Sequence, residues 1–78
     1  MKIEFENENW KINHIWDNAD GEPTQWVYKG TNLFPYYIDY IEAVDQYEVT
    51  HKYRRLYASK DFMSCVNFVE KENEDNGI

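Results

Sequence analysis

The density of aromatic side chains constrains the fold of this chain more than any other feature of its sequence. Three Trp, seven Tyr and four Phe are spread over only 78 residues. A chain of this length suits one small domain, which buries only about 60% of the surface that the unfolded chain exposes. Burial of one large apolar side chain contributes roughly 1.5–3 kcal/mol, so the rings can supply much of a core. We therefore expect residues 1–78 to form a single domain that leaves some rings on its surface.

Alternating apolar and polar residues predict three strands in the first part of the chain. The alternation runs over residues 2–6, 10–16 and 24–29, and it places the apolar residues of each segment on one face. Residues 17–23 combine Asp, Asn, Gly and Pro, which are typical of a loop, and Gly30 ends the third segment. The three segments predict an antiparallel meander.

The segment 31–46 fits two patterns. Six of its apolar residues have the spacing of one helix face, and Thr31 or Asn32 is able to cap that helix. The alternation of apolar residues between Phe34 and Tyr40 fits a strand instead, and Tyr and Ile favour strands. We expect a helix over residues 33–44, with a strand as the alternative. The residues at helical spacing are Leu33, Tyr36, Tyr37, Tyr40, Ile41 and Val44.

The last third of the chain predicts a long strand followed by a second helix. Tyr, Val and charged residues alternate over residues 47–57. We expect Ser59 to cap the helix and Asp61 to lie in its first turn, where a negative charge suits the helix dipole. The acidic tail, residues 70–78, is expected to be frayed. The apolar stripe of this helix consists of Phe62, Cys65, Val66 and Val69.

Together these elements predict a small α+β domain. Their order is βββαβα, which gives an antiparallel sheet of three to four strands. Both helices are expected on one face of this sheet, because its apolar side has to be buried against a second layer.

The charge of the chain limits the partners that it can bind. Fifteen acidic residues against eight basic ones give a net charge of −7 at pH 7. Phosphate contacts supply most of the affinity for nucleic acids, so this charge opposes direct binding to DNA, RNA or an anionic membrane. Lys52, Arg54 and Arg55 lie beside Tyr53 and Tyr57, as in a platform on which bases stack. The net charge favours the other interpretation of these basic residues, which is that they form the polar face of a strand.

Few residues offer metal-binding or catalytic chemistry. His14, His51 and Cys65 are the strong ligands for soft metals, and they are far apart in the sequence. Each falls on an apolar stripe, so we expect core residues and neither a metal nor a cofactor. A Gly-rich phosphate loop and a nucleophile elbow are both missing from the sequence, which predicts no enzyme. A single cysteine, an acidic N-terminus and the lack of a long apolar run indicate a cytoplasmic protein.

Acidic and aromatic residues are the candidates for contact with a partner protein. Carboxylates repeat over residues 4–8, crowd the loop over 17–22 and lie on the outer side of the helix predicted over 33–44. A solvated surface that keeps the domain soluble is the simplest interpretation. The functional interpretation is a negative surface that docks on a basic one, with Tyr as anchors and with Trp16 and Trp26 as further candidates. The candidate partner-binding residues are Glu4, Glu6, Glu8, Asp17, Asp20, Glu22, Tyr36, Tyr37, Asp39, Tyr40, Glu42 and Asp45.

In size, charge and lack of motifs, the chain resembles the small acidic inhibitors that phages direct against host nucleases, restriction enzymes and CRISPR complexes. The resemblance is one of general character, and it assigns a role to no residue. It implies a protein of the host cytoplasm that occludes the basic, nucleic-acid-binding surface of one partner.

Two other functions remain open on the sequence. The first is a structural or regulatory subunit that forms a homodimer through a sheet edge or an aromatic patch. The second is a small enzyme or ligand-binding domain, which requires a deep pocket. Such a pocket would be lined by Trp10, Trp16, Trp26 and His14.

Overall fold

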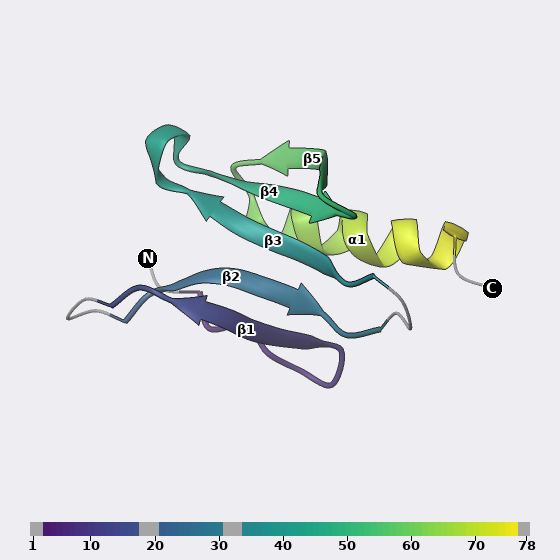
Figure 1. Cartoon of the computed structure of the whole chain (residues 1–78), viewed down its shortest axis with the longest axis horizontal. Helices are drawn as coiled ribbons and strands as arrows, with labels where there is room; N and C mark the ends of the chain where they lie inside the picture. Colours follow the sequence, from purple (N-terminus) through teal and green to yellow (C-terminus); the bar gives the residue numbers. More distant parts are fainter. Residues whose placement is uncertain (1–2, 18–20, 31–33, 77–78) are drawn as a thin grey trace.

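One five-stranded antiparallel sheet forms most of the structure, a computed structural model that describes residues 3–17, 21–30 and 34–76. The strands lie in the order β1-β2-β3-β4-β5, so each one pairs with its neighbour in the sequence (Figure 1). The 3₁₀ helix η1 (Glu42–Val44) follows the third strand, and the α-helix α1 (Phe62–Asn76) follows the fifth. The strands are β1 (Trp10–Ile15), β2 (Pro23–Tyr28), β3 (Tyr36–Ile41), β4 (Gln46–His51) and β5 (Arg54–Ser59).

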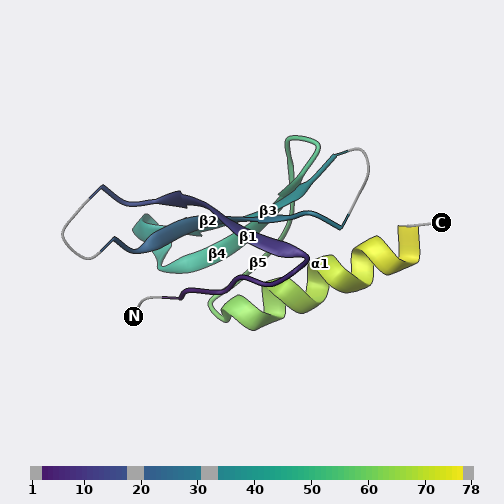
Figure 2. The same ribbon diagram turned by 90° about the horizontal axis from the view of Figure 1, so that it is seen from below.

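The core lies on one face of the sheet, which is called the inner face below. The helix α1 and the N-terminal segment both lie against this face (Figure 2). Cross-strand pairing places Trp26 beside Ile38 and Ile38 beside Val49, and all three side chains are fully buried. Alternate residues of each strand point to the same side. The aromatic and other apolar residues at every second position therefore fall on the inner face and form this core. The buried residues are Trp10, Trp26, Tyr28, Tyr36, Ile38, Val49, Phe62, Cys65, Val66 and Val69.

Side-chain hydrogen bonds hold α1 at its start and near its middle. Asp61 is its N-cap, because its carboxylate accepts hydrogen bonds from the backbone N–H of Ser64 at 3.1 Å and from its hydroxyl at 2.8 Å. The predicted cap, Ser59, accepts a hydrogen bond from the backbone N–H of Asp61 instead, at 3.0 Å. Near the middle of the helix, the indole N–H of Trp10 donates to the Glu70 carboxylate at 3.1 Å. The predicted apolar stripe is confirmed, since Phe62, Cys65, Val66 and Val69 are all buried.

The N-terminal segment, residues 3–9, contains no strand, so the strand predicted over 2–6 is wrong for the described residues. Its apolar side chains pack on the core: Phe5 meets Trp10 and Phe62 edge to face, with ring centroids 5.9 Å and 5.5 Å apart. Glu6 accepts a hydrogen bond at 2.9 Å from the backbone N–H of Ile12, on the outer edge of β1. An edge strand has unpaired backbone groups, and this carboxylate satisfies one of them.

The helix predicted over residues 33–44 is wrong, because β3 occupies the centre of that segment. Tyr36 and Ile38 are buried on the inner face, whereas Tyr37 and Asp39 lie on the opposite face and are half-buried. β3 pairs with β2 on one side and with β4 on the other. Pairing along both edges provides hydrogen-bond partners for the backbone N–H and C=O groups of this strand. The segment therefore adopts the strand that its alternating pattern indicates, and not the helix that its helical spacing indicates.

The single long strand predicted over 47–57 is also wrong, because the chain reverses in the middle of it. His51 pairs with Arg54, so Lys52 and Tyr53 form a two-residue hairpin loop between β4 and β5. Both loop residues have positive φ, 55° and 66°, as in a type I′ turn. Asn and Gly are the residues that normally signal such a turn, and neither is present here.

The predicted α+β order βββαβα, with two helices on a sheet of three to four strands, is therefore incorrect. The described residues form a sheet of five strands with one C-terminal α-helix. The tail predicted to fray from residue 70 is helical as far as Asn76, and residues 77–78 lie outside the described residues. In the part of the chain that the structure describes, no helix combines the length and the apolar character needed to span a membrane.

Candidate binding site

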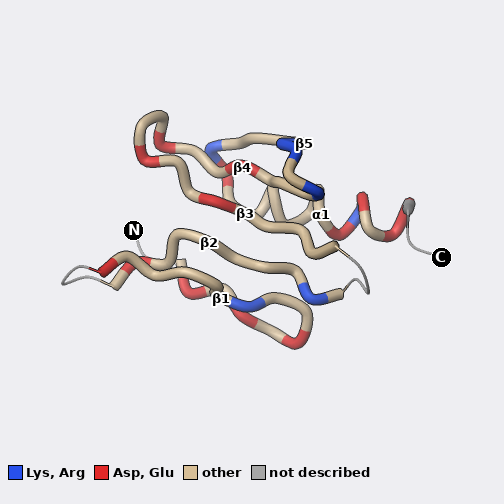
Figure 3. Tube along the Cα trace, viewed as in Figure 1, with Lys and Arg blue, Asp and Glu red and all other residues tan. Residues whose placement is uncertain are grey.

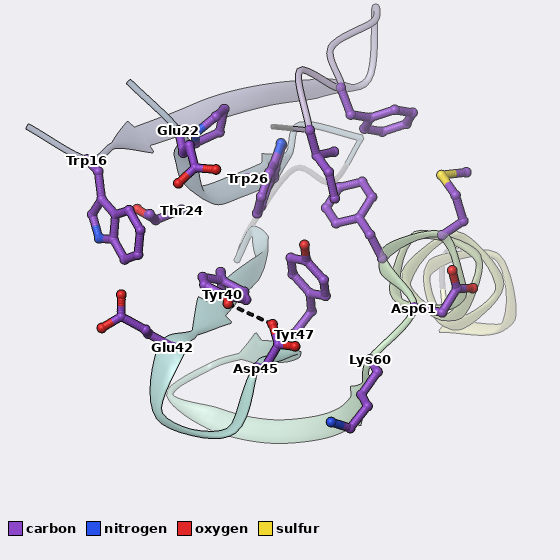
Figure 4. A pocket seen from close by; sticks show the side chains of 15 residues that line it. Trp16, Glu22, Thr24, Trp26, Tyr40, Glu42, Asp45, Tyr47, Lys60 and Asp61 are labelled. Carbon is purple, nitrogen blue, oxygen red and sulfur yellow. Dashed lines mark hydrogen bonds between the residues drawn. The ribbon is translucent and has the colours of Figure 1, made fainter. Parts of the chain in front are cut away.

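A pocket of about 690 Å³ opens on the inner face of the sheet, at the end where the β1–β2 and β3–β4 connections lie (Figure 4). The helix α1 begins beside this end and runs away from it, so it leaves this part of the inner face uncovered (Figures 1 and 2). The volume is within the range of about 300–1,000 Å³ that is typical of ligand pockets. The lining residues come from β2, β3 and β4, from the two connections, from the N-terminal segment, from the residues that follow β5 and from the start of α1.

Aromatic rings form the wall of the pocket. Trp16 meets Tyr40 edge to face, with ring centroids 6.1 Å apart, and Tyr40 meets Tyr47 at 5.2 Å. Tyr47 continues the series to Phe62 at 5.4 Å and to Trp26 at 6.0 Å. Trp16, Tyr40 and Tyr47 are half-buried, whereas Trp26 and Phe62 belong to the core. The core therefore continues into the pocket as a chain of ring contacts that becomes more exposed toward the opening.

Carboxylates surround the opening. Glu22, Glu42, Asp45 and Asp61 line the pocket, and Lys60 is the only basic residue among the described lining residues. Figure 4 shows Trp16, Glu22 and Glu42 on one side of the opening, with Lys60 and Asp61 on the other. Glu42 is exposed, and its carboxylate has no hydrogen-bond or ion-pair partner among the residues that the structure describes. The pocket thus combines ring faces with an excess of negative charge.

The β3–β4 connection positions the acids on that side of the pocket. The strand β3 ends at Ile41, η1 turns the chain, and Asp45 reverses it with a left-handed φ of 50°. The backbone N–H of Asp45 donates to the carbonyl of Glu42 at 3.2 Å. The hydroxyl of Tyr40 donates to the Asp45 carboxylate at 2.7 Å, which closes this short loop against the aromatic wall. Asp tolerates the left-handed region better than most residues, so the sequence suits this position.

The hydrogen bond to Asp45 changes the ionisation of Tyr40. It favours the neutral phenol and, with burial and the nearby negative charges, raises the pKa of Tyr40 to about 12. Burial, followed by the charge of Asp45, likewise raises the pKa of Tyr47. Both phenols are therefore neutral hydrogen-bonding groups at physiological pH.

One buried polar atom beside the pocket has no partner. Trp26 is 1% exposed, and its indole N–H has no hydrogen-bond partner among the described residues. A buried N–H group without a partner carries a desolvation cost of about 1–3 kcal/mol. The same indole ring packs on Phe62 with centroids 4.6 Å apart, so its ring contacts, rather than its N–H, hold it in place.

The structure brings together a minority of the sequence-predicted partner-binding residues. Glu22, Tyr40, Glu42 and Asp45 line the pocket, and Asp17 is exposed directly after Trp16. Glu4, Glu6 and Glu8 are exposed on the N-terminal segment, Tyr37 and Asp39 lie on the other face of the sheet, and Asp20 lies outside the described residues.

The expectation of an exposed Tyr36 is wrong. This side chain is 3% exposed and stacks on His51, with ring centroids 4.0 Å apart and an interplanar angle of 12°. Tyr36 occupies the inner face because β3 is a strand, and burial raises the pKa of its phenol. It is therefore part of the core and is not available to a partner.

The outer face of the sheet is covered by no element in the described part of the chain, and polar side chains bridge its strands. Asn13 donates to Gln25 at 2.6 Å, and Gln25 donates to Asp39 at 2.7 Å. On the next strand, Glu48 lies directly opposite Asp39 and pairs with Arg55 at 3.2 Å. Burial, together with the charge of Glu48, raises the pKa of Asp39, although its hydrogen bond from Gln25 acts in the opposite direction. The polar groups of this ladder thus pair with one another across the strands.

The three candidate metal ligands are not brought together. His14 is exposed and hydrogen-bonds Thr24 at 2.7 Å, His51 stacks on Tyr36, and Cys65 is buried on the core side of α1. His14 is thus not the core residue that its apolar stripe predicted. Burial raises the pKa of Cys65 to about 11, which keeps its thiol protonated at neutral pH. Among the described residues, no three side chains of His, Cys, Asp or Glu form a group able to hold a metal ion.

Sequence reasoning missed several residues of the pocket. The sequence pattern placed Tyr47 in a strand and Phe62 in a helix stripe, with no role in a site, and it assigned no role to Lys60. The pocket that we expected for a ligand-binding domain contains Trp16 and Trp26 but not Trp10 or His14. The signal that could have found it is the separation of β3 from β4 by a short turn, which places Tyr40 opposite Tyr47.

Comparisons with protein-family models, with curated proteins and with solved structures found no match for this chain. No enzyme family and no relative of known activity was therefore identified, and the site itself is the basis of the functional interpretation.

Proposed function

We propose that this chain is a small acidic inhibitor that binds one partner protein and occludes its basic, nucleic-acid-binding surface. The observation that carries the proposal is the meeting of exposed carboxylates and half-buried rings at the pocket end of the sheet. Carboxylates that replace phosphates give a favourable encounter with a basic surface, and aromatic anchors supply contact area.

The distribution of charge defines which end of the molecule docks. Acidic residues gather at the β1–β2 and β3–β4 connections, along the N-terminal segment and along the C-terminal half of α1, whereas basic residues lie mainly on β5 and beside it (Figure 3). Among these regions, the two connections supply Glu22, Glu42 and Asp45 to the lining of the pocket walled by rings. In our proposal the pocket end faces the partner, and the acids of α1 contribute to the net charge alone.

Displacement of DNA tests the proposal. Purified DNA-binding nucleases of restriction and CRISPR systems are each loaded with a fluorescein-labelled duplex, and this protein is titrated in while anisotropy is recorded. We expect one nuclease to release its duplex in a saturable manner, with an inhibition constant that weakens at least about tenfold between 50 and 300 mM salt because the contacts are electrostatic.

Two results would contradict this function. A nuclease that binds the protein while it still holds its DNA has an unoccluded nucleic-acid site. Displacement that is unchanged by salt removes the role of the carboxylates. The double variant Glu22→Gln/Glu42→Gln, which neutralises two acids of the opening, is expected to weaken displacement more than Glu74→Gln/Asp75→Asn does on α1.

A further inference from the structure

We propose that the pocket receives an arginine side chain of the partner, which would anchor the complex. This inference rests on the proposed function and names the chemical group that the partner presents. It follows from the combination of ring faces inside the pocket with carboxylates at its opening.

The rings of the pocket suit a cation. Trp16 and Tyr40 stand edge to face, at an interplanar angle of 74°, so their ring faces point in different directions around the opening. Both are half-buried, and Tyr47 lies beside Tyr40. A cation that lies over the face of Trp or Tyr is attracted by the ring quadrupole, and the attraction grows as water is excluded.

The acids of the opening favour a positive ligand over the alternatives. Four carboxylates and one lysine line the pocket, so an anionic ligand is repelled. An apolar ligand would cover the exposed carboxylate of Glu42 without supplying a partner for it, which is costly. A cationic side chain satisfies both the rings and the acids.

Arginine fits this chemistry better than lysine does. The planar guanidinium group stacks on aromatic faces and presents its N–H donors as a fork that matches a carboxylate, whereas the ammonium group of lysine is compact and more strongly hydrated. Both requirements line the same pocket, in the ring of Trp16 and in the carboxylates of Glu42 and Glu22. Its volume of about 690 Å³ also leaves room for the residues on either side of the arginine.

Titration with blocked tripeptides tests the inference. The probe is acetyl-Gly-Arg-Gly-amide, and its matched control is acetyl-Gly-citrulline-Gly-amide, which has the same shape without the charge. Binding is followed on the ¹⁵N-labelled protein through the indole N–H signals of its three Trp residues. We expect a saturable shift of the Trp16 signal with a millimolar dissociation constant, at least about tenfold weaker binding of the citrulline peptide, and intermediate binding of a lysine peptide.

Variants locate the binding to the pocket. Trp16→Leu removes a ring face and Glu42→Gln removes a charge. Each variant is expected to weaken binding of the arginine peptide about threefold or more. Phe34→Leu and Glu74→Gln are the matched controls, since they remove an exposed ring and an exposed acid away from the pocket. Because Glu42 is exposed on a turn, its variant keeps the fold even if the Trp16 variant is destabilised.

The outcomes separate this inference from the function on which it rests. Equal binding of the arginine and citrulline peptides, equal effects of the pocket and control variants, or no shift up to about 10 mM peptide would overturn the arginine pocket. In those cases DNA displacement that still depends on salt would leave the inhibitor function standing. Arginine binding in the pocket without any displacement of DNA would support the pocket and reject the inhibitor.

Discussion

At the residue scale, Asp39 shows that the sheet tolerates a local electrostatic cost. Its carboxylate lies directly opposite that of Glu48 on the outer face, and like charges in that position are destabilising. Burial and Glu48 raise the pKa of Asp39, while hydrogen bonds from Gln25 and Thr50 lower it. The two hydrogen bonds keep the acid in place, and they do not remove the repulsion.

Substitution of Asp39 by Asn is therefore expected to stabilise the protein. The amide keeps an oxygen that accepts from Gln25 and supplies a donor for Glu48, so Asp39→Asn should raise the free energy of unfolding at pH 7 by about 0.2–1 kcal/mol. Because the pKa of Asp39 is raised, its folded form binds a proton more readily than its unfolded form does. The gain should consequently shrink as the pH falls through this pKa toward 3.8, the ordinary value for Asp.

Urea unfolding of the two proteins at pH 7 and pH 4 measures this difference. Glu8→Gln, which neutralises an exposed acid of the N-terminal segment, is the matched control and is expected to change little. Destabilisation by Asp39→Asn at pH 7 would show that the hydrogen bonds to the carboxylate outweigh its repulsion from Glu48, and it would contradict the interpretation.

Tyr40 links the pocket to the alkaline stability of the molecule. Its folded pKa is about 12, against an ordinary value of 10.0, so between these pH values the unfolded state has released a proton that the folded state retains. Stability is therefore complete below pH 10 and is lost as the pH rises through about 12. The raised pKa values of Tyr36 and Tyr47 act in the same direction.

The variant Tyr40→Phe is expected to lose stability less steeply above pH 10 than the unmodified protein. Thermal melts between pH 8 and pH 12, with phenolate absorbance recorded in parallel, provide the comparison. Identical slopes for both proteins would mean that Tyr40 titrates normally and that its hydrogen bond to Asp45 is not maintained.

At the scale of elements, the hairpin between β4 and β5 shows why the sequence predicted some strands and not others. The ends of strands that lead into loops of Asp, Asn, Gly and Pro can be predicted from the sequence, because those residues permit turn geometry. Lys52 and Tyr53 give no such signal, and their positive φ is imposed by the pairing of the strands on either side. For the same reason β3 was mistaken for a helix, since only its pairing with two neighbours distinguishes its two patterns.

Part of the candidate site could also be predicted from the sequence. Glu22, Tyr40, Glu42 and Asp45 were identified from composition, because acids and Tyr are typical of docking surfaces. Their assembly with Tyr47 and Phe62 depends on the sheet order and on the position of α1. Neither of these was accessible from one sequence.

Tyr53 provides a test of the imposed turn. It is 102% exposed, so its removal costs no packing, but its left-handed conformation is unfavourable for an L-residue with a side chain. We expect Tyr53→Gly to raise the free energy of unfolding by about 1 kcal/mol, because glycine adopts positive φ without steric cost. Tyr53→Ala removes the ring and keeps the strain, so it should leave stability nearly unchanged in the same denaturant titration. Equal effects of the two variants would contradict the turn geometry.

At the scale of the whole molecule, the position of the acids matters more than their number. The structure measures 42 × 25 × 20 Å, and the end of α1 lies at the opposite end of the long axis from the β1–β2 and β3–β4 connections (Figures 1 and 2), whose residues line the pocket. Charges on the surface are largely screened beyond about 8 Å at physiological ionic strength. The acids of α1 are thus too remote to contribute directly at the pocket, although both groups contribute to the net charge of −7.

The measurement that tests the central claim most directly is a comparison of association rates between two variants of equal net charge. Glu22→Gln/Glu42→Gln and Glu74→Gln/Asp75→Asn each reduce the net charge from −7 to −5, the first at the pocket and the second on α1. The rate constant is measured by stopped flow at low salt with the nuclease whose DNA the protein displaces. The pocket variant is predicted to associate about fivefold or more slowly than the unmodified protein, and the α1 variant at nearly the unmodified rate. Equal slowing of both variants would show that overall charge, and not the meeting of acids and rings at one end, governs binding.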